Sequence, residues 1–318
     1  MPNLTLKNCI MTKDILSALQ ECNLSSNFCI KEEDFLKPSY IVTVAAYLKK
    51  NPIPPNSFQI QSEKHNSYLT TIGFNEALWD IPCTNQRPNV GHTYSVLTLL
   101  DNEESTDTAN TQIISCINKF TDHYQSEGLN SLKEVIGEVH DNVWSHGKST
   151  GFSMIQCYKN GIIEFALADL GGGFLKELNR VQLLISTHEE AIKWCIEKGH
   201  SSKKIEAEKH DDWTQQLPPD AIGNPMGKLA KYRKNNNHAG LGLAKLIELI
   251  QQYCGKLNIL SGNCMLSIDS NSPNMSYIPL SYEWDGVVIK CQLNVAKLKA
   301  QTASTNSELS DILAALTS

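Results

Sequence analysis

The sequence lacks any apolar run that approaches the roughly 20 residues needed to cross a bilayer. Residues 1–13 also lack the basic segment and following apolar stretch of an export signal. These absences predict a cytoplasmic protein with no membrane partner.

Paired cysteines are lacking as well. The ten cysteines are scattered singly, and none forms the C-x-x-C spacing that zinc sites and redox motifs use. Because no export signal is present either, we expect reduced thiols without disulfides and without a structural metal.

Basic charge is scarce. The chain has 28 Lys and Arg against 34 Asp and Glu, a formal net charge of −6. Proteins that bind nucleic acid are commonly basic, so we expect no nucleic-acid partner. Hydrophobic residues make up 41% of the 318 residues, which is enough for an ordinary core in one large domain or two smaller ones.

Residues 1–100 predict a small α/β domain. A helical stripe that begins with proline covers residues 38–50. Short strands are expected at 58–61 and 94–100, with a second helix between them at 68–78.

Residues 101–112 are acidic and polar and lack apolar periodicity, so they predict a linker. The larger domain is expected at 113–297, followed by a polar tail at 298–318. It should begin with a helix at 113–124.

The next predicted helix has clear end signals. Ser131 and Glu134 match the S-x-x-E pattern of a capping box, and Gly147 marks the end of the helix. Apolar residues recur between them at offsets of three and four, which predicts one buried face. The remaining elements are expected as strands at 152–158 and 162–168, a helix at 241–254, and strands at 256–261, 265–269 and 287–293.

Glu138 and Asn142 lie four residues apart on the capped helix, so both project from one face at the border of its apolar stripe. The amide oxygen of Asn142 is a suitable ligand for Mg²⁺, and the Glu138 carboxylate is suited to accept a proton. The alternative for the pair is the solvated polar edge of an amphipathic helix.

A second motif, A-D-L-G-G-G-F at 168–174, directly follows an apolar strand. A carboxylate at Asp169 is suited to accept a hydrogen bond from an adenine amino group. The glycines let the backbone approach a ligand closely. The alternative is a plain turn from a strand into a loop.

A third motif, G-L-G-L, opens the helix at 241–254. Backbone amides at a glycine-rich helix N-terminus form a phosphate site, because they lack partners within the helix and the helix dipole is positive there. The alternative is a turn into a helix. The motif consists of Gly240, Leu241, Gly242 and Leu243.

In this order, the three motifs resemble the N, G1 and G2 boxes of the GHKL superfamily, to which DNA gyrase, histidine kinases and MutL belong. The resemblance covers residues 113–297, including 190–202, which resembles the helix and turn after the G1 box. It implies a histidine-kinase-like ATPase domain with the Bergerat ATP-binding fold. That fold is a two-layer α/β sandwich with a mixed, mostly antiparallel sheet.

The resemblance also implies roles for individual residues. Asp169 would hold adenine in a pocket shaped by Gly171 and Gly173, Asn142 would bind Mg²⁺, and Glu138 would be the general base. The residues of the G-L-G-L motif would bind the phosphates of ATP. Residues 175–238 would form the ATP lid. One departure from the family pattern is Val287 after Gly286, where many relatives have threonine.

His146 and Gly147 extend the first motif to E-x-x-x-N-x-x-x-H-G, which is most similar to anti-sigma-type kinases. His146 is placed to touch a phosphate or a lid group, and packing at the helix end is its alternative role. The segments at 35–48 and 67–78 are loosely similar to STAS-like segments that precede GHKL domains in some bacterial proteins.

Two functions follow from the resemblance. The first is an enzyme of bacterial signalling that hydrolyses ATP or transfers its γ-phosphate to a protein partner, such as a regulator or a STAS-like protein. The second is a non-catalytic switch that binds a partner when ATP is bound. A homodimer is compatible with both. A complete histidine kinase is not expected, because no helical hairpin with a phosphoacceptor histidine precedes residue 119.

Overall fold

A five-stranded antiparallel sheet forms the centre of the protein, as shown by a computed structural model that describes residues 12–24, 28–30, 35–83, 86–145, 149–202, 205 and 241–300. The predicted mixed α/β class is confirmed. Every strand pair in this sheet is antiparallel, although a mixed sheet was expected. The strand order is β5 (Thr98–Leu100), β6 (Gly151–Cys157), β7 (Ile162–Asp169), β9 (Ser272–Asn294) and β8 (Lys256–Asp269).

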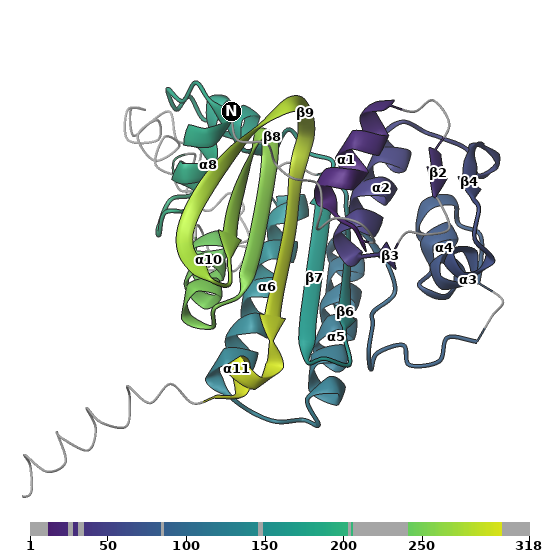
Figure 1. Ribbon diagram of the computed structural model, residues 1–318. Coiled ribbons are helices and arrows are strands. Elements are labelled where there is room, and N and C mark those ends of the chain that lie inside the picture. Colours follow the sequence, from purple (N-terminus) through teal and green to yellow (C-terminus); the bar gives the residue numbers. More distant parts are fainter. Residues whose placement is uncertain are drawn as a thin grey trace, which may run out of the picture.

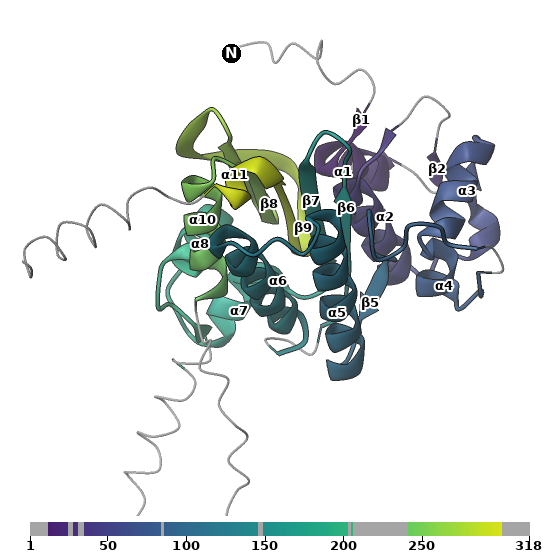
Figure 2. The same ribbon diagram turned by 90° about the horizontal axis from the view of Figure 1, so that it is seen from below.

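One face of the sheet is covered by helices that follow β5 in the sequence (Figures 1 and 2). Val139 and Ile250 from these helices share a core with Phe165 and Ile289 from the strands. The helices are α5 (Glu103–Phe120), α6 (Glu127–Ser145), α7 (Gly173–Arg180), α8 (His188–Ile196), α10 (Gly242–Gln252) and the short α11 (Val295–Lys299).

The N-terminal segment covers the opposite face of the sheet (Figure 2). Tyr40 and Val44 pack in one core cluster with Phe152, Met154 and Val288 of the central strands. The segment contains β1 (Thr12–Lys13), α1 (Ile15–Leu24), β2 (Phe28–Ile30), β3 (Phe35–Leu36), α2 (Pro38–Lys50), a 3₁₀ turn (Pro55–Ser57), β4 (Phe58–Ile60), α3 (Glu63–Thr71) and α4 (Phe74–Trp79).

This shared core corrects one prediction. In the described chain the N-terminal segment packs on the central sheet as a further layer, so it does not have a core separate from that of the sheet. The physical reason is that both faces of β6 and β7 are apolar, so each face needs a cover. The strand expected at 94–100 is limited to β5 and belongs to the central sheet.

The linker expected at 101–112 is also wrong, because α5 begins at Glu103. Asn102 and Ser105 form a reciprocal capping box, and two acidic residues in the first turn match the positive end of the helix dipole. Buried Thr106, Ala109 and Ile113 recur at offsets of three and four. Because the segment is mostly polar, its short apolar stripe was not recognised as a helix in the sequence.

Other element bounds also differ, and β9 begins at Ser272 although its strand was expected only at 287–293. Helix α6 begins at Glu127, not at the predicted Ser131 cap, because buried Leu129 extends its apolar face and the Ser126 hydroxyl accepts a hydrogen bond from the Leu129 amide at 3.3 Å. The helix expected at 68–78 is divided by Gly73, whose φ is +78°. The strands expected at 256–261 and 265–269 form one strand, β8, which bulges at Gly262.

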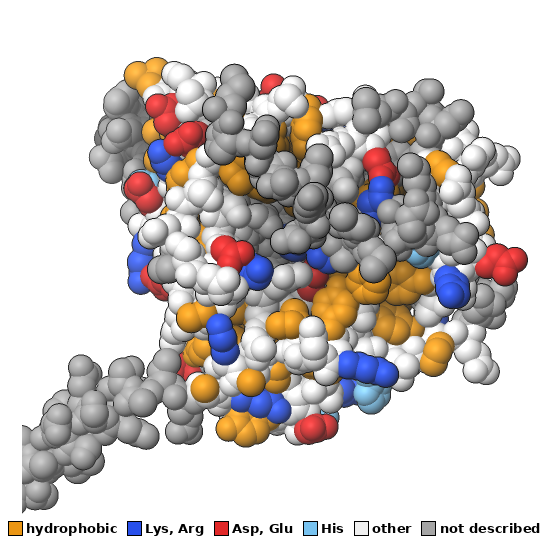
Figure 3. Space-filling model, in the orientation of Figure 1, with side chains coloured by type: hydrophobic (Ala, Val, Ile, Leu, Met, Phe, Trp, Pro, Cys, Tyr) orange, Lys and Arg blue, Asp and Glu red, His pale blue; other side chains and the backbone are white. Residues whose placement is uncertain are grey.

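The surface of the described residues has mixed character. None of their helices combines the length and the apolar character needed to cross a membrane. On the face shown in Figure 3, acidic and basic side chains are interspersed, and hydrophobic side chains gather below α1 and α2. The half-exposed Phe35 of β3 has its ring centroid 6.4 Å from that of Tyr158.

Candidate functional site

A cavity of about 340 Å³ lies where the end of β7 meets α6, α7 and the start of α10. This volume is in the range of small-molecule sites. Six of the predicted site residues line the cavity: Asn142, Asp169, Gly171, Gly173, Gly242 and Leu243. Segments far apart in the sequence therefore converge on one concave site.

The other predicted site residues have different outcomes. Glu138 and Leu241 are described but do not line the cavity. His146 and Gly240 lie outside the described residues, as do Gly147, most of the predicted lid (203–204 and 206–238) and the tail from residue 301.

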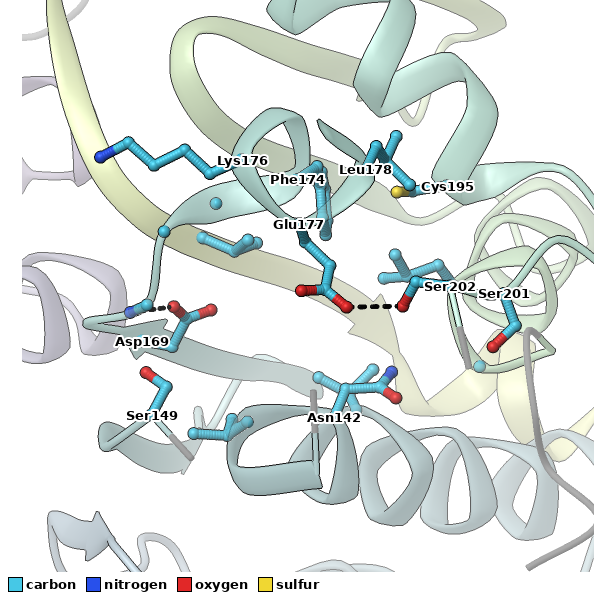
Figure 4. Close-up of a pocket in the computed structure, with 18 of the residues that line it drawn as sticks. Asn142, Ser149, Asp169, Phe174, Lys176, Glu177, Leu178, Cys195, Ser201 and Ser202 are labelled. Carbon is cyan, nitrogen blue, oxygen red and sulfur yellow. Dashed lines mark hydrogen bonds between the residues drawn. The ribbon is translucent and has the colours of Figure 1, made fainter. Parts of the chain in front are cut away.

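Asp169 ends β7 with its carboxyl group in the cavity (Figure 4). Burial raises its pKa to about 6, although hydrogen bonds from the backbone amides of Gly171 and Val287 oppose the rise. The Gly171 amide donates to Asp169 Oδ1 at 2.8 Å. These two amides fix the orientation of the carboxyl group.

Glycines allow the backbone to pack tightly around Asp169. Gly286 has a φ of +113°, and a Cβ built there would lie 2.2 Å from the Asp169 carbonyl oxygen. At Gly173, with a φ of +72°, a Cβ would lie 2.8 Å from the Ser261 hydroxyl. That hydroxyl accepts a hydrogen bond from the Phe174 amide at 2.9 Å, which fixes the start of α7. No larger residue fits at either position without displacing the cavity wall.

Helix α6 presents Asn142 to the cavity from the side opposite α7 (Figure 4). The helix is fixed to its neighbours by His140, which is fully buried. The His140 Nδ1 atom is 2.6 Å from Asn110 Oδ1, and its Nε2 atom is 2.6 Å from the Ser153 hydroxyl. Burial lowers the pKa of His140 to about 3, so the ring is neutral and its two hydrogen bonds are structural.

Gly242 brings α10 against the face of α6 that carries the first motif. A Cβ at Gly242 would lie 3.0 Å from Glu138 Cβ and 3.6 Å from Asn142 Nδ2. Glu138 is buried and accepts a hydrogen bond from Lys245 Nζ at 2.5 Å. This ion pair raises the pKa of Lys245. The predicted general base therefore joins α6 to α10 in this structure.

The chain was compared with protein-family models and with curated proteins. No protein-family model matches the chain, and no curated protein matches it.

A polar group on the α7 side of the cavity was not predicted from the sequence. Glu177 accepts a hydrogen bond from the Ser202 hydroxyl at 2.7 Å, and from Arg180 Nε at 2.9 Å and Nη2 at 3.0 Å. All three residues line the cavity. The spacing of Glu177 and Arg180 on one helix weakly predicts that they pair. Nothing in the sequence predicts that Ser202 lies beside them.

The raised pKa of Asp169 predicts a pH-dependent difference in stability between the native protein and Asp169→Asn. The folded-state pKa of about 6 exceeds the ordinary value of 3.8. The stability that this group contributes is therefore present below pH 4 and lost as the pH rises through 6. The Asn side chain does not titrate.

Between pH 4 and pH 8, the free energy of unfolding of the native protein should fall by about 2.5 kcal/mol relative to that of Asp169→Asn. Urea unfolding of both proteins at pH 4, 6 and 8, without nucleotide, measures this difference. A difference that stays constant with pH would show that the Asp169 carboxyl group is not desolvated in the folded protein.

Proposed function

We propose that the chain binds ATP and Mg²⁺ in the cavity beside Asp169, through a Bergerat-type ATP-binding domain of the GHKL superfamily. One observation carries the proposal. A partly buried carboxyl group at the end of β7 and an amide on α6 face one cavity, and a glycine at the start of α10 packs beside that amide. This is the convergence that the three sequence motifs predict.

The chemistry of each group fits its proposed partner. Adenine carries an exocyclic amino donor, which the Asp169 carboxylate is suited to accept. Mg²⁺ prefers oxygen ligands and keeps several waters, so the Asn142 amide oxygen with the phosphates of ATP suffices to hold it. At the start of α10, backbone amides and the helix dipole favour the phosphates.

The proposed reaction is hydrolysis of ATP, or transfer of its γ-phosphate to a side chain of a protein partner. In either reaction the cation would neutralise charge on the phosphates while the protein positions the reacting groups. Glu138 is the proposed general base. Its carboxylate would have to exchange Lys245 for a water or a partner hydroxyl to act in this way.

A second candidate function is a non-catalytic switch, in which bound ATP creates a surface for a partner protein. The ion pair between Glu138 and Lys245 favours it. Glu138 does not line the cavity, and its carboxylate holds two helices together.

Measuring phosphate release by the native protein and by Glu138→Gln distinguishes the two functions. If Glu138 is the base, the variant should release phosphate at least about 100-fold more slowly, because general-base catalysis contributes roughly 10²–10⁴-fold. Calorimetric titration with Mg²⁺–ATP should show unchanged affinity. Glu248→Gln, an exposed change on α10, is the matched control.

Equal, negligible phosphate release by the native protein and Glu138→Gln, with intact ATP binding, would exclude ATP hydrolysis with Glu138 as the base and favour the switch. Absence of saturable ATP binding by the native protein would contradict both functions.

A further inference from the structure

We propose that Glu177 binds the ribose hydroxyls of the nucleotide, so that the site selects ribonucleotides over deoxyribonucleotides. This inference rests on the proposed function and names a residue that the three sequence motifs do not contain. Its support is the position of the carboxylate in the cavity and the hydrogen bonds that orient it.

The position of Glu177 follows from the order of groups in a nucleotide. Asp169 marks the proposed base end of the cavity, and Asn142 with Gly242 marks the phosphate end. The sugar connects base to phosphate, so it must lie between these ends. Figure 4 shows the Glu177 side chain extending from α7 into the cavity, in the space between Asp169 and Asn142.

The carboxylate is held in place before any ligand arrives. Arg180 donates two hydrogen bonds to it, at 2.9 and 3.0 Å, and the buried Ser202 donates one at 2.7 Å. A fixed acceptor loses little conformational entropy when it binds a ligand, which favours selectivity. Arg180 also compensates the charge of Glu177.

The chemistry of a carboxylate then selects the ligand group. A carboxylate is repelled by phosphates, and the adenine amino group is already assigned to Asp169. Ribose hydroxyls are the remaining hydrogen-bond donors of ATP. Ser202 shows that a hydroxyl can donate to this carboxylate from within the cavity wall. In dinucleotide-binding sites, a carboxylate commonly accepts a hydrogen bond from a ribose hydroxyl.

Calorimetric titration with ATP, 2′-deoxyATP and 3′-deoxyATP, each with Mg²⁺, tests the proposal in the native protein and in Glu177→Ala. The native protein should bind ATP about tenfold more tightly than at least one deoxy analogue, as expected for one hydrogen bond to a charged acceptor. Glu177→Ala should lose this preference, with a weaker affinity for ATP and a nearly unchanged affinity for that analogue.

Two further variants separate recognition from structure. Glu189→Ala removes an exposed carboxylate on α8 that pairs with Lys193, and it should keep the native preference. Glu177→Gln keeps the size of the side chain and should reduce the preference for ATP over the deoxy analogue. This variant tests the proposal even if Glu177→Ala fails to fold.

Equal affinities of the native protein for all three nucleotides would overturn the proposal and leave ATP binding intact. So would an equal loss of affinity for all three in both Glu177 variants. Absence of binding of any nucleotide by the native protein would instead overturn the proposed function, and this inference with it.

Discussion

Asp169→Asn should lower the affinity for Mg²⁺–ATP by at least about 100-fold, the largest effect on binding that we expect from any single substitution. The native carboxylate accepts hydrogen bonds from the amides of Gly171 and Val287 and is positioned to accept one from adenine. An Asn side chain replaces one acceptor oxygen by an NH₂ donor. In either orientation of the amide, the Asn NH₂ group would face one of the N–H donors that the carboxylate accepts from.

Calorimetric titration of both proteins measures this loss, with near-ultraviolet circular dichroism as the check on folding. Asp269→Asn is the matched control, because Asp269 also ends a strand but is exposed and pairs with Lys256. Its affinity for ATP should equal that of the native protein. A tenfold loss or less in a folded Asp169→Asn would mean that this carboxyl group does not hold the base.

Gly286→Ala should have the largest effect on stability, at least about 3 kcal/mol in the free energy of unfolding. Its φ of +113° is unfavourable for a residue with a side chain, and the new Cβ would lie 2.2 Å from the Asp169 carbonyl oxygen. Relief requires β9 to move away from the end of β7, which widens the cavity. Urea unfolding measures the loss.

Gly161→Ala is the matched control for backbone strain. Gly161 also has a positive φ, +79°, but a Cβ there meets no atom within 4 Å. Gly161→Ala should lower the free energy of unfolding by only about 1 kcal/mol, which is the strain of a left-handed backbone conformation. Similar losses in the two variants would show that contact with Asp169 contributes nothing beyond backbone strain.

The sequence predicted the parts of the site that depend on local patterns. Asp169 ends a strand and Gly242 begins a helix, and both line the cavity. Asn142 also lines it, whereas Glu138, four residues earlier on the same helix face, does not. These predictions needed only the period of the secondary structure and the preferences of glycine.

Contacts between distant segments could not be predicted in this way. The ion pair from Glu138 to Lys245 spans 107 positions in the sequence, and the hydrogen bond from Ser202 to Glu177 spans 25. Neither leaves a periodic signal. Both depend on how α6, α7, α8 and α10 pack, which is a property of the complete fold.

The N-terminal layer was mispredicted for a related reason. Residues 1–100 carry enough local signals for a small domain, and α2 has the bounds that its stripe predicts. However, the apolar face of α2 is buried against β6 and β7. Two apolar faces on one strand indicate that other elements pack on both sides of the sheet. They do not indicate which segment of the chain packs on the second side.

The central claim is that the cavity beside Asp169 holds one magnesium-bound adenine nucleotide. A crystal structure of the protein with Mg²⁺ and a non-hydrolysable ATP analogue tests it most directly. We predict adenine within hydrogen-bond distance of the Asp169 carboxylate and the cation on the amide oxygen of Asn142. A nucleotide bound elsewhere, or an empty cavity at saturating analogue, would contradict the account.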